Sequence, residues 1–406
     1  MADATASLKE SGHRAVMTSP RTVGDGLAVA SVSPVSDEAR AAYSTFCRTA
    51  LFAPAQSPQW VRHWTEQIRP DAILATLAAG DRPLLSLALE IERHGPFRVA
   101  RFMGGRHANG NFAAVDPARL DEIARPQMRT LFDAVSAARP DIDVVALQRL
   151  LPDFDGTANP LAKLPSFPSP NLSLAVDLDG GFEAVLSRMS GRRKKKKHRS
   201  QTRKFEAAGG VRRIQARTQE EVHSLLYAFF AMKEFRFRRM GIANVFGDPQ
   251  VRIFLHKLFA EALKESEPPF LLHGLEVAGK LRAVTGSSVG GRRLICGFGA
   301  ISEDDLAHAS PGDFLFYENI AEACRNGFSV YDFSVGDEPY KRQWCDIEMK
   351  HLDVLVPLTL KGRMLASGLR GNAGAKAFIK NSPKIWSLTK ALRRKTAGKR
   401  PSTDED

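Results

Sequence analysis

Cysteines and metal-binding patterns are scarce in this sequence. Only four of its 406 residues are cysteines, and they form no CxxC pair because they stand far apart, at Cys47, Cys296, Cys324 and Cys345. This spacing argues against a zinc ribbon or a disulfide scaffold and fits a reducing compartment. The ten histidines are also dispersed, without HExxH or another ligand spacing. We therefore expect a cytoplasmic protein without a metal cofactor.

Long apolar runs are equally absent. No window approaches the run of about 20 apolar residues that spans a bilayer. The N-terminus reads MADATASLKESGHRAVMTSPRTVGDG and lacks the apolar core of a secretory signal. The glycine-containing segment GGRHANGN does not stand between a strand and a helix, so it does not predict a dinucleotide site. With 43% hydrophobic and 25% charged residues, the chain has the composition of a globular protein.

Positive charge is what the sequence does have, and it is concentrated in two segments. The formal net charge is +13. Residues 192–204 contain nine Lys or Arg and no acid, and the tail from Lys361 contains twelve against three acids, so each segment carries +9. The rest of the chain is therefore mildly acidic, and each basic segment needs its own explanation.

The first half of the chain has the periodicity of a small α+β domain after a polar lead, residues 1–25, that we expect to be disordered. Ser57 and Pro58 predict a helix N-terminus, with Trp60 and Trp64 on the inner face of that helix. The expected elements are a strand at 27–32, helices at 39–49 and 57–68, strands at 72–78, 83–92 and 97–103, a helix at 117–138 and a strand at 141–148.

The second half repeats this order. A strand at 172–178 leads into one long helix that carries the basic run and ends at Gly209 and Gly210. Further expected elements are a strand at 211–217, helices at 218–239 and 248–265, strands at 270–277, 280–289 and 292–300, a helix at 313–326, and strands at 328–334 and 349–358.

This repeated order predicts two similar α+β domains. We place them at 26–168 and 169–360, because the Pro-rich segment LPDFDGTANPLAKLPSFPSPNL separates the two patterns. A basic, partly helical tail follows at 361–406. Its helix is expected to be interrupted by Gly371, Gly374 and Pro383, with a small apolar face made by Ile385, Trp386, Leu388 and Leu392.

A candidate anion site lies where the strand at 292–300 is followed by a loop and a new helix. Ser310 can cap this helix, Pro311 suits its first turn, and Gly312 lets a ligand approach the backbone closely. A helix N-terminus has free N–H groups and the positive end of the helix dipole, which attract phosphates. An ordinary capped helix without a ligand explains the same residues and is the more frequent case.

A second cluster follows the strand YDFS, in the segment VGDEPYKRQW. Acids, a phenol and an amine at the end of a strand are groups that proton transfer uses, and here they are Asp332, Asp337, Tyr340 and Lys341. A solvated charged loop is the alternative. Asp332 lies inside an apolar strand and needs a partner, for which Lys341 is a candidate; such an ion pair could equally be structural.

Several motifs together resemble one family. The chain has ASPG before a helix, a helix ending in Gly, an Asp-Phe strand and Gly-Asp-x-x-Tyr-Lys-x-x-Trp, at Ser310, Pro311, Gly312, Gly327, Asp332, Phe333, Gly336, Asp337, Tyr340, Lys341 and Trp344. Upstream stand an Arg/Lys-rich helix and the segment FGDP. This pattern is similar to that of the CelD/BcsL-like acetyltransferases of cellulose biosynthesis, GNAT-superfamily proteins related to FemAB. The resemblance covers roughly residues 170–357.

The resemblance implies tandem GNAT-like (acyl-CoA N-acyltransferase) domains with mixed central sheets flanked by helices. It implies acetyl-CoA or another acyl-CoA as the cosubstrate, bound at Ser310, Gly312 and Asp313, with Lys341 and the arginines of the basic run, such as Arg192 and Arg203, balancing its phosphates. Asp332 or Asp337 would act as the base, and Tyr340 would protonate the departing thiolate. The usual Arg/Gln-x-x-Gly-x-Gly/Ala loop is missing, and AHASPG stands in its place.

Three functions remain open from the sequence. The first is acyl transfer, most simply N-acetylation, from acyl-CoA to an amine or hydroxyl of a small molecule or saccharide, with a role in exopolysaccharide or cellulose synthesis. The second is FemAB-like aminoacyl transfer from a charged tRNA. The third is a non-enzymatic protein that binds nucleic acid or a membrane surface. Nucleic acid is not the expected partner, whereas a peripheral membrane contact by the basic tail stays open.

Overall fold

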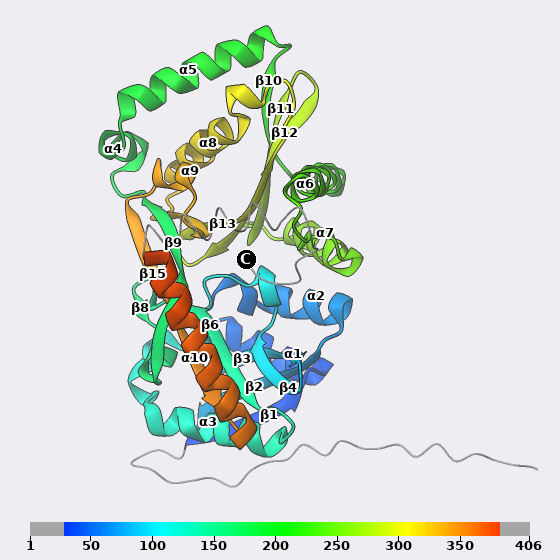
Figure 1. The fold of residues 1–406 in the computed structure, drawn as a ribbon. Coiled ribbons are helices and arrows are strands. Elements are labelled where there is room, and N and C mark those ends of the chain that lie inside the picture. Colours follow the sequence, from blue (N-terminus) through cyan, green and yellow to red (C-terminus); the bar gives the residue numbers. More distant parts are fainter. Residues whose placement is uncertain (1–27, 382–406) are drawn as a thin grey trace, which may run out of the picture.

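The computed structural model describes residues 28–381, with side chains up to residue 371. The first half of the chain forms the lower lobe of Figure 1. Its strands and helices are β1 Ala28–Pro34, α1 Asp37–Cys47, α2 Pro58–Ile68, β2 Asp71–Ala79, β3 Arg82–His94, β4 Phe97–Phe102, β5 Ala114–Val115, α3 Arg125–Ala138, β6 Val144–Leu150, β7 Asp153–Phe154 and β8 Thr157–Ala158. Four 3-10 helices join them, η1 Pro54–Gln56, η2 Gly105–His107, η3 Pro117–Glu122 and η4 Pro160–Lys163.

The second half forms the upper lobe and returns to the lower one at its end (Figure 1). Its elements are β9 Ser166–Asp177, α4 Gly181–Arg188, α5 Gly191–Ala207, β10 Val211–Gln215, α6 Gln219–Met240, α7 Pro249–Ala262, β11 Phe270–Val277, β12 Lys280–Gly290, β13 Arg293–Ile301, η5 Ala307–Ala309, α8 Pro311–Arg325, β14 Val330–Val335, α9 Pro339–Arg342, β15 Ile347–Pro357 and α10 Leu360–Asn381. The predicted strands and helices of both halves are confirmed to within a few residues, except where stated below and at two places: the helix expected at 117–138 is divided into η3 and α3, and β9 begins at Ser166 instead of residue 172.

One mixed sheet of 13 strands runs through both lobes, in the order β1-β2-β3-β4-β6-β15-β9-β14-β13-β12-β11-β10, with β5 paired to β3. Each half contributes an antiparallel meander and one parallel pair, β4 with β6 and β13 with β14. The order is thus nearly mirror-symmetric about the centre. This is a tandem α+β arrangement, although the two predicted central sheets are joined into a single one.

The centre of the sheet is formed by β15 and β9, which lie side by side between β6 and β14. β9 follows the first half in sequence but pairs with β14, and β15 follows β14 but pairs with β6 as well as β9. The sequence analysis assigned residues 349–358 to the second domain alone, and in the structure this strand also extends the first half of the sheet. The boundary at 168/169 falls inside β9, so the division into separate domains stays a prediction.

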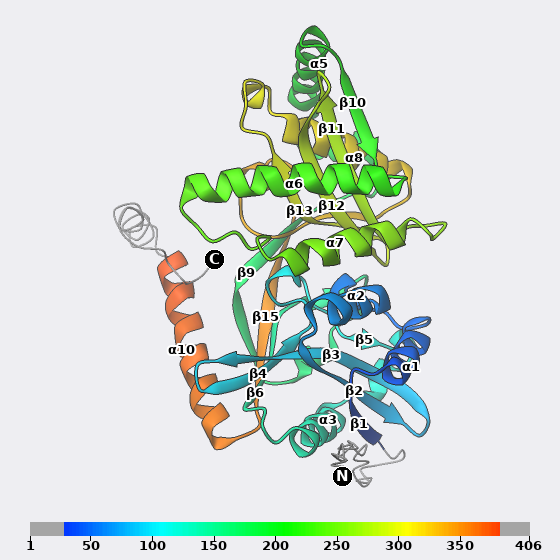
Figure 2. The same cartoon turned by 90° about the vertical axis from the view of Figure 1, so that its right-hand side faces the viewer.

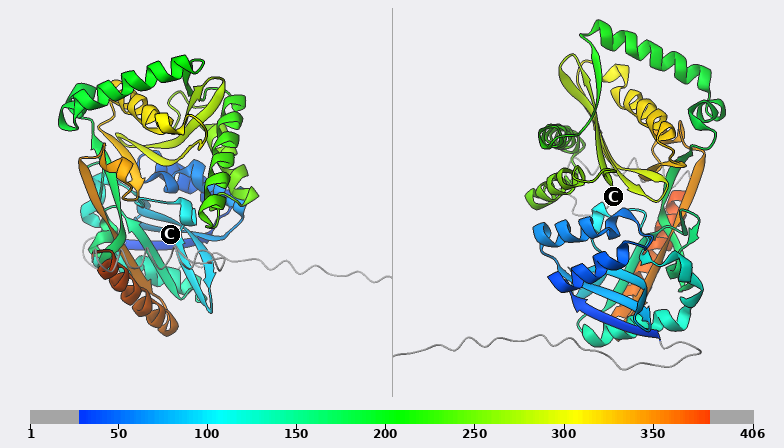
Figure 3. Two further views of the ribbon diagram at one scale, coloured as in Figure 1. Left: turned by 45° about the horizontal axis from the view of Figure 1, so that its top comes forward. Right: turned by 180° about the vertical axis from the view of Figure 1, so that it is seen from behind.

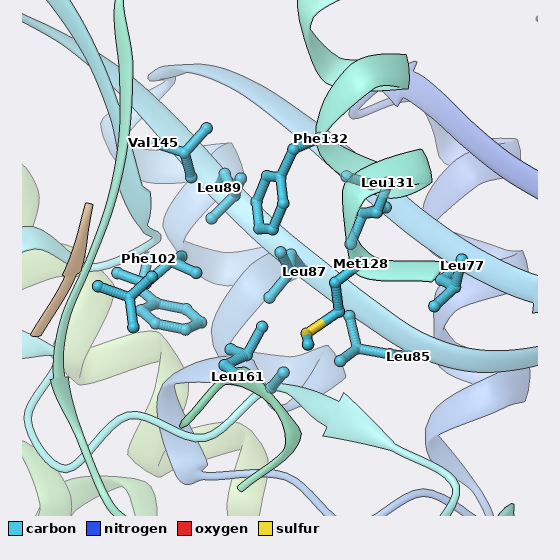
Figure 4. Packing of buried hydrophobic residues seen from close by; sticks show 14 of the residues in the cluster. Leu77, Leu85, Leu87, Leu89, Phe102, Met128, Leu131, Phe132, Val145 and Leu161 are labelled. Atoms are coloured by element: carbon cyan, nitrogen blue, oxygen red, sulfur yellow. The ribbon is translucent and has the colours of Figure 1, made fainter. Parts of the chain in front are cut away.

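The lower lobe has its own apolar core, formed between the sheet and α3. Leucines of β2 and β3 meet Met128, Leu131 and Phe132 of α3, and these side chains are at most 4% exposed (Figure 4). Alternation along the strands aims these residues at one face, and the α3 residues recur at helical spacing.

A second core joins the two lobes. α2 of the lower lobe packs on α7 of the upper lobe (Figure 2). There Trp60 and Trp64 each form a T-shaped contact with Phe254 at a ring-centroid distance of 4.9 Å. Ser57 caps α2 and Pro58 occupies its first turn, as predicted. The prediction that both tryptophans belong to the core is confirmed, with exposures of 8% and 5%.

Two predictions about helices are wrong. The single long helix expected from Phe182 onward is broken between α4 and α5, because Ser190 has a left-handed backbone with φ 59°. The expected interruptions at Gly371 and Gly374 do not occur, since α10 runs through both positions. Pro383 and the apolar face expected at 385–392 lie outside the described residues, as does the lead 1–25. No helix in the described range is long and apolar enough to cross a membrane.

Candidate active site

The parallel strands β13 and β14 separate soon after they begin. Their pairing covers only three residues and ends at Ile295 and Asp332. Beyond this point β13 pairs only with β12, and a bulge at Gly297 interrupts that ladder, because Ser287 faces Cys296 while Gly286 faces Phe298. Within the described residues, no other segment pairs with β13 or β14 in the gap between them.

The corresponding gap in the first half is closed by the chain itself. β4 and β6 also pair over three residues, ending at Arg101 and Ala146. Next to the following residues of β6 lies Asn111, whose N–H donates to Arg149 O at 2.9 Å and whose side-chain amide donates to Gln148 O at 2.9 Å. Leu151 N in turn donates to Asn111 O at 3.0 Å. The edge of β6, which corresponds to β14 in the strand order, is therefore satisfied by the chain in the first half.

A cavity of about 290 Å³ adjoins the open gap and lies between the two lobes. The lower lobe contributes Trp60, Arg106, His107 and Asn109 to its wall. Side chains of α6 and α7 and the strand residues Ser287, Gly297, Phe298 and Ser334 form the rest. Gly286 has to be glycine here, because a Cβ would come within 2.0 Å of the Phe298 ring. The cavity thus reaches both β13 and β14 where they part.

Asp332 is buried at the point where the strands separate, and its partner is not the predicted one. Its carboxylate pairs with Arg293 at 3.2 Å, whereas Lys341 bonds elsewhere. Its other oxygen accepts from the Ser334 N–H at 2.7 Å and so holds Ser334 in a left-handed conformation, φ 59°. Burial raises the pKa of Asp332 and Arg293 opposes that rise. This geometry suits a positioning residue, because Ser334 rather than Asp332 lines the cavity.

Lys341 is the centre of a tight loop. Its ammonium, on a residue only 4% exposed, donates to Val335 O at 2.7 Å and pairs with Glu338 at 2.9 Å. Gly336 has φ 127°, and a Cβ there would lie 2.8 Å from the Lys341 Nζ. The bonds of this ammonium are thus made within the loop that follows β14, which suits a structural role for Lys341.

The other two predicted groups of this loop are more accessible. Asp337 pairs with Arg342 near the surface. Tyr340 is 42% exposed and stacks on Phe316 with a ring distance of 5.6 Å and an angle of 6°. Burial of part of the phenol raises the pKa of Tyr340, so it stays protonated at neutral pH and can donate a proton.

The N-terminus of α8 differs from the prediction at Ser310 and at Gly312. Ser310 occupies the N-cap position, but its side chain makes no capping bond, because its backbone is left-handed at φ 58°. Pro311 begins the helix as expected. Gly312 accommodates β13 rather than open space, since a Cβ would lie 2.6 Å from Ile301 Cγ2. Asp313 pairs with Lys197 at 2.8 Å and accepts from the Trp344 indole at 3.2 Å.

The basic run has two different faces. One face of α5 packs on α8 (Figure 3). In this contact the Gln201 side chain donates to the carbonyls of Ala309 and Ser310 at 2.9 and 3.0 Å. The His198 ring stacks on the Tyr317 ring at a centroid distance of 4.0 Å. On the same side the Lys194 ammonium lies 3.5 Å from the Trp344 ring centroid, and burial lowers its pKa to about 8.

The other face of α5 is exposed. Arg192, Lys196, Arg199 and Arg203 recur every three or four residues along it. None of the four forms an ion pair with another described residue. Arg192 and Arg203, which were predicted to bind the donor, therefore lie on the face of α5 opposite to the one packed on α8.

The structure also supplies groups that the sequence analysis did not select. Lys233, Ser287, Arg106 and His107 line the cavity. Burial, reinforced by Arg106, lowers the pKa of His107 to about 4, so the imidazole is neutral at pH 7. Arg106, His107 and Asn109 belong to the segment GGRHANGN, and the glycines of this segment are the feature of the sequence that could have drawn attention to these three residues. No feature of the sequence pointed to Lys233, because a lysine on an amphipathic helix usually faces solvent.

No cluster of His, Cys, Asp or Glu that could hold a metal occurs in the described part of the chain. The buried thiol of Cys296 lies beside the gap, and burial raises its pKa to about 11, so it remains a thiol rather than a nucleophilic thiolate. The groups present suit direct transfer between two bound molecules better than a covalent enzyme intermediate.

Comparison with known proteins shows what these features are similar to. Residues 192–342 match the model of an acetyltransferase (GNAT) domain. The structure is similar to that of FemX, with a TM-score of 0.54 at 10% identity over 80% of this chain and 97% of that one. No curated protein sequence matches the chain.

Two further solved structures are similar at lower scores. The first is L-PGS from Bacillus licheniformis, with a TM-score of 0.48 at 10% identity over 86% of this chain and 97% of that one. The second is a tandem GNAT protein from the clavulanic acid biosynthesis pathway, with a TM-score of 0.45 at 12% identity over 81% of this chain and 99% of that one. At these identities the likeness concerns the fold alone. The chain has a tandem GNAT-like fold, and the residues that match the acetyltransferase (GNAT) domain model lie in its second half.

Proposed function

We propose that this protein is an acyl-CoA-dependent acyltransferase whose reaction takes place in its second half. The acyl group would lie in the gap between β13 and β14, and the acceptor, through an amine or hydroxyl, would enter from the cavity between the lobes. The observation that carries this proposal is the contrast between the open gap of the second half and the gap that Asn111 closes in the first. The matched acetyltransferase model lies on the same half.

The unpaired backbone edge of β13 beyond Ile295 supports a binding role. Backbone N–H groups at such an edge can donate to a thioester carbonyl and stabilise the negative charge that develops on its oxygen. The bulge at Gly297 lies two residues beyond the point where the pairing with β14 ends. In the first half the gap is not free in the same way, because the edge of β6, the counterpart of β14, is already bonded to Asn111.

The chemistry would be a direct attack. The acceptor nitrogen or oxygen forms a bond to the acyl carbon, the carbon–sulfur bond breaks, and the acceptor loses one proton to solvent or to Asp337. The departing thiolate takes a proton from Tyr340, which solvent restores. Asp332 and Lys341 position the strand end and the loop through Ser334 and Val335.

The donor's phosphates would lie near the first turn of α8. Ser310, Gly312 and Asp313 form this turn, and Lys194 and Lys197 approach it from α5. Asp313 would have to release Lys197 for a phosphate to use it, because the carboxylate now holds that ammonium. Arg192 and Arg203 would attract the donor only over a longer range. A role in exopolysaccharide or cellulose synthesis stays a prediction.

Aminoacyl transfer from a charged tRNA is the second candidate, and one observation favours it. The exposed face of α5 presents four cations without acidic partners, which is how proteins contact nucleic-acid phosphates. FemX shares the fold, but its own substrates do not transfer with a fold at 10% identity. Binding of nucleic acid or a membrane without catalysis would leave the open gap and the cavity without a role.

Thermal unfolding with different donors separates these functions. A ligand that binds only the folded protein raises the melting temperature by mass action. We expect acetyl-CoA or a longer acyl-CoA to raise it, with free CoA less effective. Stabilisation by tRNA but by no CoA species would favour aminoacyl transfer, and no response to any acyl donor would overturn the proposed function.

A further inference from the structure

Lys233 is an unpaired cation in an aromatic environment. It lies on α6 and lines the cavity between the lobes. Its ammonium lies 5.9, 5.5 and 5.9 Å from the ring centroids of Phe229, Phe237 and Phe246. It forms no hydrogen bond or ion pair with any residue in the described range. Glu338 attracts it electrostatically but is already paired with Lys341 at 2.9 Å.

The rest of the cavity wall also combines positive charge with aromatic surface. Among the described residues, its charged side chains are Lys233 and Arg106, one from each lobe, and no Asp or Glu lines it. The buried Ser287 hydroxyl also lines the cavity, beside the thiol of Cys296. Aromatic side chains cover much of the remaining wall, including Trp60, Phe259 and Phe298. Positive charge and apolar surface are therefore combined without a negative group.

Such a combination is unfavourable without a ligand. Removing an ammonium from water favours its neutral form, and burial accordingly lowers the pKa of Lys233 to about 8. Contacts with ring faces offset this cost only in part. A carboxylate supplied by the protein would remove the cost, as Glu338 does for Lys341, yet none is placed in the wall. An anion brought by a ligand would take its place.

We propose that the cavity binds an acceptor that carries an anionic group, a carboxylate or a phosphate, which pairs with Lys233 while an apolar body packs against the aromatic wall. Calling this ligand the acceptor rests on the proposed function, whereas the binding itself does not. The same charge pattern would favour the reaction, because neighbouring cations lower the pKa of an acceptor amine and keep it neutral for attack.

Small probes test this site without an acyl donor. We would titrate the full chain with 3-phenylpropionate and with phenyl phosphate, and use 3-phenylpropan-1-ol as the neutral match. The control variant is Lys257→Met, an exposed lysine of α7 without an ion pair to other described residues. The two anions distinguish a carboxylate from a phosphate ligand.

We expect at least one anion to bind, with Lys233→Met raising its Kd about tenfold or more and Lys257→Met leaving it unchanged. The alcohol should bind the wild-type chain and both variants equally weakly. Met matches the length of the lysine stem, and Lys233→Arg, which keeps the charge, should bind the anion nearly normally. Equal affinity of wild type and Lys233→Met for both anions, or no anion binding at millimolar concentration, would overturn the inference.

Kinetics separate this role from that of a general base. An anchoring cation predicts that Lys233→Met raises KM for anionic acceptors far more than for neutral ones; a base would lower kcat for both. Turnover with acyl-CoA but without any preference for anionic acceptors would contradict this inference alone. Anion binding without acyl transfer would contradict the proposed function alone.

Discussion

The two halves of this protein build the same arrangement of strands and finish it differently. In each, two parallel strands pair over three residues and then separate. In the first half Asn111 fills the gap with three hydrogen bonds of 2.9 to 3.0 Å. In the second half the gap stays open and borders a cavity, and a buried ion pair between Arg293 and Asp332 marks its start.

In our proposal this difference gives the two halves different roles. A strand edge without partners has to be satisfied by a ligand, by water or by the chain. In the first half, the chain itself bonds to the strand edge through Asn111. This half contributes Trp60 and the segment with Arg106 and His107 to the wall of the cavity. The second half keeps the unpaired edge, so its β13 edge is available to an acyl group.

The largest effect is expected from Asp332→Ala, at the open gap. It leaves the buried Arg293 without a partner, which should lower the free energy of unfolding by about 3–5 kcal/mol in urea titrations. Asp332→Asn combined with Arg293→Met removes both charges and should recover part of this loss. Turnover per folded molecule should fall about tenfold or less in Asp332→Asn, because Asn still accepts from Ser334. A larger loss at unchanged stability would make Asp332 the base.

A pH-dependent difference is expected from Glu90, a 2%-exposed acid of the first half that accepts from the Trp64 indole at 2.7 Å. Burial raises its pKa from 4.5 to about 7. The folded state therefore holds this proton more tightly than the unfolded state. The resulting stability is full below pH 4.5 and is lost as the pH rises to 7, by about 3 kcal/mol.

Glu90→Gln keeps an acceptor for Trp64 and removes the titration. Urea unfolding between pH 4.5 and 8 should show a flatter slope for this variant and higher stability than wild type at pH 8. Glu322→Gln in the second half is the matched control, because pairing with His273 and Arg213 lowers the pKa of Glu322 to about 2. That variant should be destabilised at neutral pH, and equal slopes for wild type and Glu90→Gln would contradict the assignment.

A smaller effect is expected from Asn111→Ala, which removes one bond of the closed gap. Gln148 O would lose its partner, so the free energy of unfolding should fall by about 1–2 kcal/mol. Turnover per folded molecule should stay within about twofold, because the first half is not the reacting one. A loss of turnover that exceeds the loss of stability would give the first half a catalytic role.

The smallest effect is expected on the outer face of α5. Replacing Arg192 and Arg203 together by Ser should change stability by no more than about 0.5 kcal/mol. KM for the acyl donor should rise by less than about threefold, whereas Lys197→Met, at the first turn of α8, should raise it more. The reverse order would place the donor's phosphates on the outer face, as the sequence first suggested.

The sequence was informative about the fold because its signals are local. Strand alternation, the capping residues Ser57 and Pro58 and the Gly–Gly stop after the basic run each act over a few residues. The central position of β9 and β15 was not predictable in this way, because it depends on pairings between residues far apart in the chain, such as Leu352 with Leu150. A single sequence shows the strands but not their neighbours.

The site was predictable in part. The segment with Asp332 and Tyr340 was singled out from its residue types, but the partner of Asp332 comes from the neighbouring strand β13 rather than from the loop. Lys233 and Arg106 were missed because each is an ordinary residue of its own element. Only the packing of α6 and η2 around one cavity gives them a shared environment.

Hydrogen exchange with acetyl-CoA tests the location of the reaction most directly. At a saturating concentration of acetyl-CoA, amide exchange should slow in β13, in β14 and in the first turn of α8, and should stay unchanged in β4 and β6. A bound carbonyl at the β13 edge protects the amides that donate to it. Protection at β4 and β6, or an active enzyme without protection at β13 and β14, would contradict the assignment of acyl transfer to the second half.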